Sequence, residues 1–309
     1  MKILIIGYGS IGKRHSKILS NIKKIDKIDI VTGQNLKEYN YGNCFDSLYN
    51  ITNIEEYDYF IIANETYKHF DTLKYITEYV NDKKILVEKP LFCRIKKLNI
   101  FNNSIYVAYN LRFHPIIEKI KNILENEKVL FANLIAGQYL PNWRPNTDYR
   151  KSYSASSKKG GGVLRDLSHE LDLINFLFSQ IESIFTINKK ISDLEIFSDD
   201  IFTGIGKTKN GVIVNITLDY ISKIALRKII IHTLNKTIKA DIIKNKIEIC
   251  DKYGNHQILK KEVERNDSYL KMHLAVINDE VESLCSFKDG LKVMQLIDKV
   301  KLNKANDEK

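Results

Sequence analysis

A glycine-rich turn close to the N-terminus constrains the fold of this chain more than any other feature. Residues 7–12 read Gly-Tyr-Gly-Ser-Ile-Gly, directly after an apolar run at 2–6 that predicts a buried strand, and residues 11–22 have the apolar spacing of a helix. In such a strand–turn–helix the first glycine permits the tight turn, the second lets the backbone approach a pyrophosphate, and the third lets the helix pack on the strand. The turn therefore predicts that a dinucleotide, NAD or NADP, binds here. The contacting residues would be Gly7, Gly9, Ser10, Ile11 and Gly12.

The choice between NAD and NADP depends on the end of the second predicted strand. An acid about 20 residues after the glycines usually binds the adenosine ribose, but counting from Gly12 reaches Thr32, and Asp29 falls inside the strand. A missing acid removes the group that repels a 2′-phosphate, so NADP is compatible, with Thr32 or Lys37 near it. No arginine stands there either, and the choice stays open.

The order of the predicted elements divides the chain into two domains. In residues 1–113 short apolar strands alternate with helices, which predicts a parallel Rossmann sheet covered on both faces. In residues 114–309 strands follow one another with few helices between them, mainly at 162–178 and 269–284, which predicts a mainly antiparallel sheet in an α+β domain. The strands expected in this second part lie at 129–135, 182–187, 202–205, 212–218, 228–232, 237–240 and 246–250.

Composition excludes several classes of protein. No apolar run approaches the roughly 20 residues that cross a bilayer, and the N-terminal run is too short for a signal peptide, so we expect a cytoplasmic protein without membrane contact. The formal charge of +10 is spread along the chain, which does not favour nucleic-acid binding. The four cysteines form no CxxC pair and have no histidine at ligand spacing, which argues against a metal site and against a disulfide framework.

Two further segments carry groups suited to catalysis. Glu88-Lys89-Pro90 follows a predicted strand at the carboxyl edge, where open α/β sheets bind ligands, and its lysine could steer the proton of a substrate hydroxyl, with Pro90 possible in the cis form. Residues 160–172 begin with three glycines that lead into a predicted helix. There Asp166 and Asp172 stand three residues on either side of His169, and a histidine held by a carboxylate is a good acid/base near neutral pH.

Taken together and in order, these motifs resemble the Gfo/Idh/MocA family, named after glucose–fructose oxidoreductase, inositol dehydrogenase and rhizopine catabolism. The resemblance extends over essentially the whole chain and is carried by residues 7–15, 63–66 with His69, 88–90, 109–113 and 160–172. It implies that residues 114–309 form an open, mainly antiparallel sheet domain for substrate binding and oligomerisation. It also implies hydride transfer between a nicotinamide and a secondary alcohol or ketone of a sugar or polyol, in a homodimer or homotetramer.

The resemblance also assigns roles to individual residues. Lys89, His169 and Asp166 would be catalytic, while Asn64, His69 and Glu88 would join Thr32 in the cofactor site. The cleft would be lined by Asn110, Arg112, His114 and Asp172. Many members place the aspartate and histidine four residues apart rather than three, so His169 is the firmer assignment.

The loop at 139–154 resembles a branch associated with surface-sugar biosynthesis. Its Trp143, Arg144 and Arg150 suit an acidic or phosphorylated sugar, because aromatic faces stack on sugar rings and guanidinium groups bind phosphate or carboxylate. We therefore expect an NAD(P)-dependent dehydrogenase or ketoreductase of a sugar or nucleotide-sugar. Two alternatives stay open: a non-catalytic NAD(P)-binding regulator, and an enzyme that retains its cofactor and shuttles hydride between two sugars.

Overall fold

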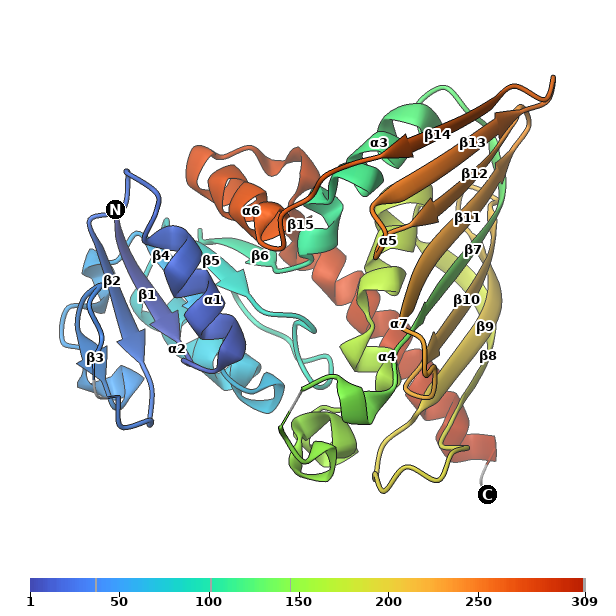
Figure 1. Ribbon diagram of the computed structural model, residues 1–309. Coiled ribbons are helices and arrows are strands. Elements are labelled where there is room, and N and C mark those ends of the chain that lie inside the picture. The colour runs from blue at the N-terminus through green and yellow to red at the C-terminus, as the bar shows by residue number, and fades with distance from the viewer. Residues whose placement is uncertain (37, 101, 145, 308–309) are drawn as a thin grey trace. The chain divides into compact units, whose positions relative to one another are not determined.

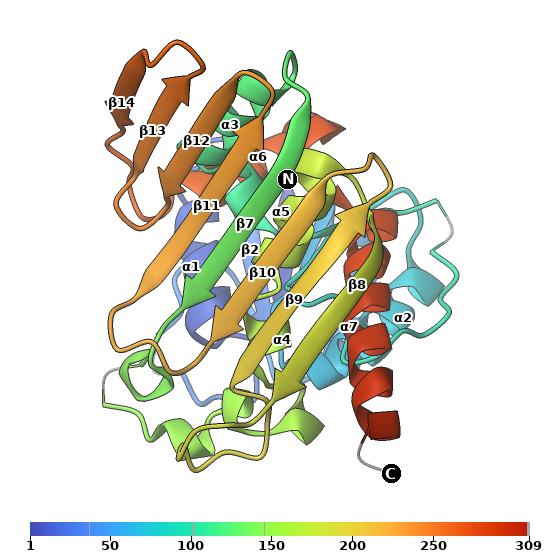
Figure 2. The ribbon, with the colours of Figure 1, turned by 90° about the vertical axis from the view of Figure 1, so that its right-hand side faces the viewer.

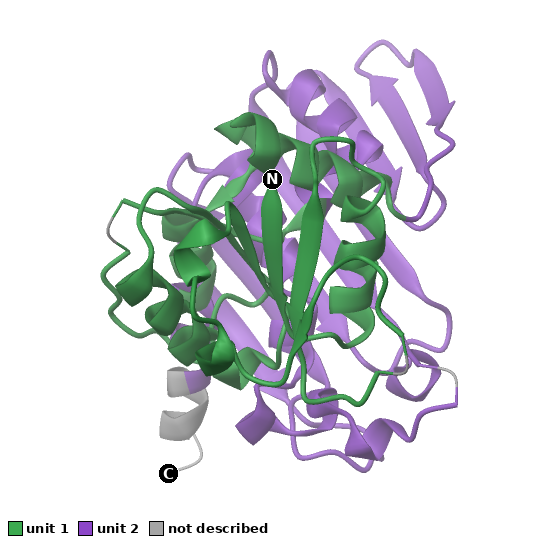
Figure 3. Cartoon of the chain, turned by 90° about the vertical axis from the view of Figure 1, so that its left-hand side faces the viewer, with its two compact units in different colours: residues 1–110, 266–294 green, residues 111–265, 295–309 purple. Residues whose placement is uncertain are grey.

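The computed structural model describes residues 1–36, 38–100, 102–144 and 146–307 and forms two compact units, each described here by itself. Unit 1 comprises Met1–Asn110 and Asn266–Met294, and unit 2 comprises Leu111–Arg265 and Gln295–Lys309 (Figure 3). The chain thus crosses between the units three times, whereas the sequence pattern predicts a single boundary at residue 113.

Unit 1 is built on a seven-stranded sheet in the order β15-β6-β5-β4-β1-β2-β3 (Figure 1). All its strand pairs are parallel except β15 with β6. The order β3-β2-β1-β4-β5-β6 is that of a Rossmann fold, which confirms the prediction for this part of the chain. The strands are β1 (Lys2–Ile6), β2 (Lys27–Val31), β3 (Cys44–Phe45), β4 (Tyr59–Ile62), β5 (Lys84–Val87), β6 (Ser104–Val107) and β15 (Cys285–Ser286).

Helices cover this sheet because its central strands are apolar on both faces. Every residue of β4 is buried, as are the last three of β5, so neither strand has a side open to water. Gly290 lies close against Val107 of β6, where a Cβ would lie 2.5 Å from a methyl carbon of the valine. The helices of unit 1 are α1 (Ser10–Leu19), α2 (His69–Tyr79), α6 (Asp267–Asn278) and the first part of α7 (Phe287–Asp307).

Unit 2 is built on an eight-stranded sheet in the order β14-β13-β12-β11-β7-β10-β9-β8. Its pairs are antiparallel except β10 with β7, so the predicted mainly antiparallel sheet is confirmed. Figure 2 looks onto the face of the sheet that no helix of this unit covers; α4 and α5 lie behind it. The strands are β7 (Val129–Gly137), β8 (Ile181–Lys189), β9 (Ile201–Thr208), β10 (Ile213–Asp219), β11 (Leu226–Thr233), β12 (Lys236–Asp241), β13 (Lys246–Asp251) and β14 (His256–Lys260).

The prediction of one helix over 162–178 is wrong in one respect, because this segment forms two helices. α4 (Val163–Asp166) ends at Leu167, whose φ of −100° and ψ of 30° leave the helical region, and α5 (His169–Phe178) begins two residues later. The apolar spacing continues across this break, which is why periodicity alone does not reveal it. Unit 2 also contains α3 (Pro115–Leu124) and the last part of α7, from Gln295 onward. Short 3-10 helices lie at Thr66–Lys68, Asn110–Phe113, Leu140–Asn142, Tyr149–Lys151, Tyr153–Ala155 and Ser157–Lys159.

Candidate active site

The glycine turn of unit 1 has the geometry that a pyrophosphate site needs. Gly7 has a φ of +98°, and a Cβ on it would lie 2.4 Å from the backbone nitrogen of Asn64. A Cβ on Gly12 would lie 2.0 Å from the carbonyl oxygen of Gly7, whereas a Cβ on Gly9 would meet nothing within 4 Å. Two glycines thus close the turn and the middle one faces open space. Because Gly9 caps α1 without a side-chain hydrogen bond, the first N–H groups of α1, from Ser10 onward, remain for an anionic ligand.

The adenosine end of this site carries no carboxylate at the tip of β2. Thr32 follows β2, and its hydroxyl accepts a hydrogen bond from the N–H of Gln34 at 3.2 Å. Asp29 lies inside the strand, where the Tyr57 hydroxyl donates to it at 2.6 Å and the Lys27 ammonium lies 3.0 Å away. Lys37 lies outside the described residues. The geometry therefore keeps NAD and NADP both open.

His69 connects the loop after β4 to the segment after β5. One ring nitrogen lies 3.1 Å from the carbonyl oxygen of Asn64, and the other lies 3.2 Å from the carbonyl oxygens of Pro90 and Leu91. The Asn64 side chain donates to the Thr72 hydroxyl at 2.9 Å. Burial lowers the pKa of His69. His69 thus holds two loops at the edge where the sheet presents its carboxyl ends.

The Glu88-Lys89-Pro90 segment lies at that same edge, directly after β5. The peptide bond between Lys89 and Pro90 is cis, as the sequence allowed. The carboxylate of Glu88 is buried and takes two hydrogen bonds, from the N–H of Lys89 at 3.2 Å and with the ring of His15 at 2.9 Å. Asn110 is buried too, and its amide donates to the Ser268 hydroxyl at 2.8 Å. Unit 1 therefore brings the predicted cofactor residues and Lys89 to one edge of its sheet.

In unit 2 the Asp166 carboxylate is hydrogen-bonded by a tyrosine, and Asp166 and His169 lie on different helices. It ends α4, and the Tyr220 hydroxyl donates to its carboxylate at 2.6 Å in a buried position. Burial and the Asp166 charge raise the pKa of Tyr220, and the same charge, followed by burial, raises that of Tyr153. His169 is the first residue of α5 and is also buried. Asp166 and His169 therefore belong to two different helices, although the sequence predicts one continuous helix over 162–178.

Arg112 and Asp172 form a buried ion pair within unit 2. The guanidinium donates through Nε at 2.9 Å and through Nη2 at 2.6 Å to the two carboxylate oxygens, and the side chains are only 4% and 1% exposed. The Phe176 ring lies 4.7 Å from the guanidinium carbon. Such a bidentate pair fixes both side chains, so Arg112 and Asp172 form one rigid element of the candidate site. His114, predicted for the same cleft, is buried and caps α3 by accepting from the N–H of Ile116.

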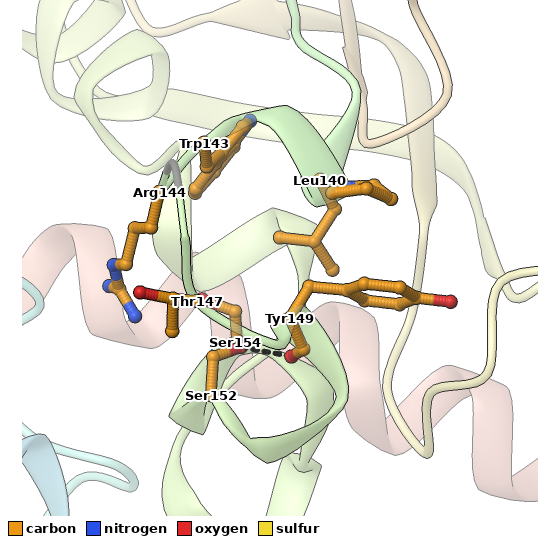
Figure 4. Close-up of a pocket in the computed structure, with 8 residues that line it drawn as sticks. Leu140, Trp143, Arg144, Thr147, Tyr149, Ser152 and Ser154 are labelled. Atoms are coloured by element: carbon orange, nitrogen blue, oxygen red, sulfur yellow. Dashed lines mark hydrogen bonds between the residues drawn. The ribbon is translucent and has the colours of Figure 1, made fainter.

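The loop carrying Trp143 and Arg144 surrounds a small hollow (Figure 4). The Trp143 indole donates to the carbonyl oxygen of Gln138 at 3.1 Å, and its ring meets Tyr220 edge-on with centroids 5.1 Å apart. Arg144 is exposed and lies over the Tyr153 ring, 5.1 Å from its centroid. The same two tyrosines that neighbour Asp166 therefore support both predicted substrate residues. The hollow is lined by Leu140, Pro141, Trp143, Arg144, Thr147, Tyr149, Ser152 and Ser154. Arg150 instead pairs on the surface with Asp148 and Glu195.

Sequence reasoning missed several residues that hold these groups. Tyr153 and Tyr220 next to Asp166 carry no local signal, because a tyrosine in a loop or at a strand end is ordinary. His15 stands three residues after the glycine turn and was visible only as part of the family motif, and its partner His273 gave no signal at all.

Among the described residues, no group of three or more His, Cys, Asp or Glu side chains is placed to hold a metal ion. None of the described helices is both long enough and apolar enough to cross a membrane.

Fold and site together define a two-unit protein with a nicotinamide-dinucleotide domain, and comparison with known proteins places it in a family. Residues 1–101 match the model of the oxidoreductase family with the NAD-binding Rossmann fold, and residues 118–238 match the GFO/IDH/MocA C-terminal domain. The two matches cover most of the chain. The protein belongs to the Gfo/Idh/MocA oxidoreductase family, and the predicted nicotinamide cofactor is confirmed for its first domain.

Individual relatives are distant in sequence and similar in fold. Glucose-6-phosphate 3-dehydrogenase of Bacillus subtilis is 24% identical over 241 residues; the match covers 70% of this chain and 66% of that protein, just under two thirds. Levoglucosan dehydrogenase, solved with NADH and levoglucosan, superposes with a TM-score of 0.86 at 16% identity, over 100% of this chain and 97% of that one. UDP-N-acetylglucosamine 3-dehydrogenase from Acidithiobacillus ferrooxidans has a TM-score of 0.77 at 15% identity, over 98% and 97% of the two chains.

Proposed function

We propose that this protein is an NAD(P)-dependent dehydrogenase or ketoreductase that acts on a secondary alcohol or ketone of a sugar or nucleotide-sugar. The observation that carries the proposal is the position of Lys89, at the carboxyl edge of a Rossmann sheet whose glycine turn is intact. A protein that only sensed the dinucleotide would have no need of a lysine there beside a buried, hydrogen-bonded carboxylate. Bound NAD(P) would supply or accept the hydride.

In this proposal the chain's own residues handle the proton of the substrate hydroxyl. His169 takes or returns that proton, since an imidazole titrates near neutral pH, and Lys89 donates a hydrogen bond to the same oxygen. Asp166 and Asp172 are each held by a partner, Tyr220 and Arg112 respectively, so they act as fixed charges near His169 rather than as proton carriers.

Two features support a sugar that carries an anionic group. Arg144 is exposed beside Trp143 at the hollow of Figure 4, an arrangement suited to stacking on a ring and binding a phosphate or carboxylate. Two of the relatives named above act, by their names, on a sugar phosphate and a nucleotide-sugar, while the third acts on levoglucosan, which is neutral. We therefore propose a phosphorylated or nucleotide-linked sugar as the substrate, and the resemblance of the loop at 139–154 favours a role in the biosynthesis of surface glycans.

The test begins with titration of the protein with NADH and NADPH by nicotinamide fluorescence. A panel of UDP-sugars, sugar phosphates and sugar acids is then followed at 340 nm. On the best substrate we expect Lys89→Met and His169→Asn each to lower kcat by roughly 100-fold while the Kd for NADH stays the same. Lys97→Met and His256→Asn, which change exposed residues of the same types, serve as matched controls.

The results separate the proposal from its alternatives. Unchanged turnover in Lys89→Met would overturn the assigned chemistry, and binding of NADH without turnover across the whole panel would favour the regulator. Copurified cofactor that survives dialysis would favour the enzyme that shuttles hydride between two sugars. Failure to bind either dinucleotide would overturn the cofactor site itself.

We also propose that the uncovered face of the unit 2 sheet joins copies of this chain into a homodimer or homotetramer. Along β8 and β9 the exposed side chains include Phe185, which is 83% exposed, with Ile187 and Ile205, and Phe185 is paired with Ile205 across the strands. Figure 2 shows these two strands at one edge of the sheet. A contiguous exposed apolar patch of this kind marks an association surface. A monomer at micromolar concentration in sedimentation velocity would contradict this proposal.

A further inference from the structure

Four buried side chains form a continuous hydrogen-bonded row through unit 1. The Tyr59 hydroxyl, from β4, lies 3.0 Å from Nδ1 of His273 on α6. Nε2 of His273 lies 2.8 Å from Nδ1 of His15 on α1, and Nε2 of His15 lies 2.9 Å from Oε1 of Glu88. Tyr59, His15 and His273 are fully buried and Glu88 is 8% exposed. We call Tyr59, His273, His15 and Glu88 the buried relay.

Counting donors fixes the direction of the buried relay. An ionised carboxylate only accepts hydrogen bonds, so His15 donates to Glu88 through Nε2–H and its Nδ1 is left as an acceptor. His273 must then donate through its own Nε2–H, and its Nδ1 accepts from the hydroxyl of Tyr59. Two neutral imidazoles, each as the Nε2–H tautomer, satisfy every group in the row. The chemistry of the four groups thus selects one protonation state for the whole row.

The opposite direction leaves a group without its partner. If Glu88 were protonated and donated to His15, each imidazole would become the Nδ1–H tautomer, and His273 would donate to the oxygen of Tyr59. The hydroxyl hydrogen of Tyr59 would then lose its acceptor in a fully buried position, which costs roughly as much as an unmade hydrogen bond. Burial, followed by the neighbouring His15, lowers the pKa of His273, and burial with the Glu88 charge raises that of Tyr59. Both shifts agree with a neutral ring and a neutral phenol.

The end of the buried relay lies next to the proposed catalytic lysine. The second oxygen of the Glu88 carboxylate, Oε2, accepts a hydrogen bond from the backbone N–H of Lys89 at 3.2 Å. We propose that the buried relay holds the Glu88 carboxylate in one orientation, and thereby positions Lys89. This inference rests on the proposed function in assigning Lys89 to catalysis; Tyr59, His15 and His273 act through Glu88 as positioning residues.

The first experiment needs no substrate. The protein is labelled with ¹⁵N-histidine, and the signals of two of its seven histidines, His15 and His273, are assigned by single His→Gln substitutions. At pH 7 we expect both rings to be neutral Nε2–H tautomers. Finding the Nδ1–H tautomer or an imidazolium at either position would overturn the relay in the wild-type protein, whatever the variants do.

The second experiment breaks the far end of the relay with Tyr59→Phe. Because His273 then loses the donor at its Nδ1, we expect its ¹⁵N signals to move and those of His15 to follow. The matched control is Tyr57→Phe, which removes a buried hydroxyl that donates to Asp29, outside the relay, and should leave both histidines unchanged. Unchanged His15 and His273 signals in Tyr59→Phe would overturn the coupling.

The third experiment tests whether the relay reaches Lys89. With the sugar found in the panel, we expect Tyr59→Phe to lower kcat about tenfold, the order of one lost buried hydrogen bond, with the KM for the cofactor unchanged. A kcat equal to that of Tyr57→Phe would overturn the positioning role even if the histidine signals had moved. If the wild-type protein turned over no sugar, the proposed function would fall, while the histidine spectra would still decide the relay.

Discussion

Replacing Asp172 by asparagine tests how rigidly unit 2 holds the arginine of the candidate site. Asparagine keeps the size of the side chain and one acceptor oxygen. It removes the negative charge, however, and turns an NH₂ group toward a guanidinium that already lies at 2.6 and 2.9 Å from the carboxylate. Arg112 is 4% exposed, so water cannot replace the lost partner. The substitution therefore removes the negative charge that faces a buried guanidinium.

The size of the effect follows from that burial. Removing one partner of a buried ion pair costs roughly 3–5 kcal/mol, and the remaining oxygen of asparagine places this case at the lower end, about 3 kcal/mol. For a unit of this size each kcal/mol shifts Tm by roughly 2–4 °C, so we expect Tm to fall by roughly 6–12 °C. Differential scanning calorimetry of the wild-type protein and Asp172→Asn measures this directly, independently of any substrate.

Two further variants show whether the reasoning is right. The double variant Arg112→Met with Asp172→Leu removes both charges together and should recover most of the lost stability. Arg150→Met removes an arginine whose carboxylate partners, Asp148 and Glu195, lie on the surface, and should leave Tm unchanged. A fall of less than about 2 °C in Asp172→Asn, set against the shift expected above, or a double variant as unstable as the single one, would refute the argument.

Two other predictions follow from unit 1. Gly12→Ala should lower Tm and abolish NADH binding, because its Cβ would lie 2.0 Å from the Gly7 oxygen. Gly9→Ala should keep the Tm of the wild-type protein and lower only the affinity for NADH, since its Cβ would meet nothing within 4 Å. Equal Tm values in the two variants would contradict this reasoning. Stability should fall as the pH drops from 6.5 to 5, because His69 and His273 have lowered pKa values and the unfolded chain binds protons there that the folded chain does not. Each such proton adds a slope of roughly 1.4 kcal/mol per pH unit to the free energy of unfolding. If the free energy of unfolding in urea did not depend on pH in this range, the lowered pKa values of these two histidines would be contradicted.

The sequence predicted those parts of the fold that depend on local pattern. The strand at 59–62 and the antiparallel strands of unit 2 follow from runs and alternations of apolar residues, and the glycine turn follows from its place between a strand and a helix. β14 was missed because its residues, His-Gln-Ile-Leu-Lys, are mostly polar and exposed. The break at Leu167 was missed because an apolar residue there fits a continuous helix as well as an interrupted one.

Contacts between residues far apart in the chain were beyond the sequence. Arg112 and Asp172 were each predicted for the cleft, but nothing in a pattern shows that residues 60 positions apart bind one another. Tyr59 and His273 are 214 positions apart, and each is an ordinary residue in its own segment. Local spacing thus predicts which residues reach the sheet edge in unit 1, while tertiary packing decides what holds them there.

The return of the chain to unit 1 has a consequence for how this protein is made. α6 packs on α1, and β15 completes the edge of the sheet beside β6, yet both come from residues beyond 265. Domains generally fold in the order in which the ribosome releases them, N-terminal first. Here the dinucleotide domain emerges first but is completed only after all the strands of unit 2 have been synthesised. A nascent chain or fragment that stops before residue 266 therefore carries an uncovered α1 and a histidine, His15, whose partner does not yet exist.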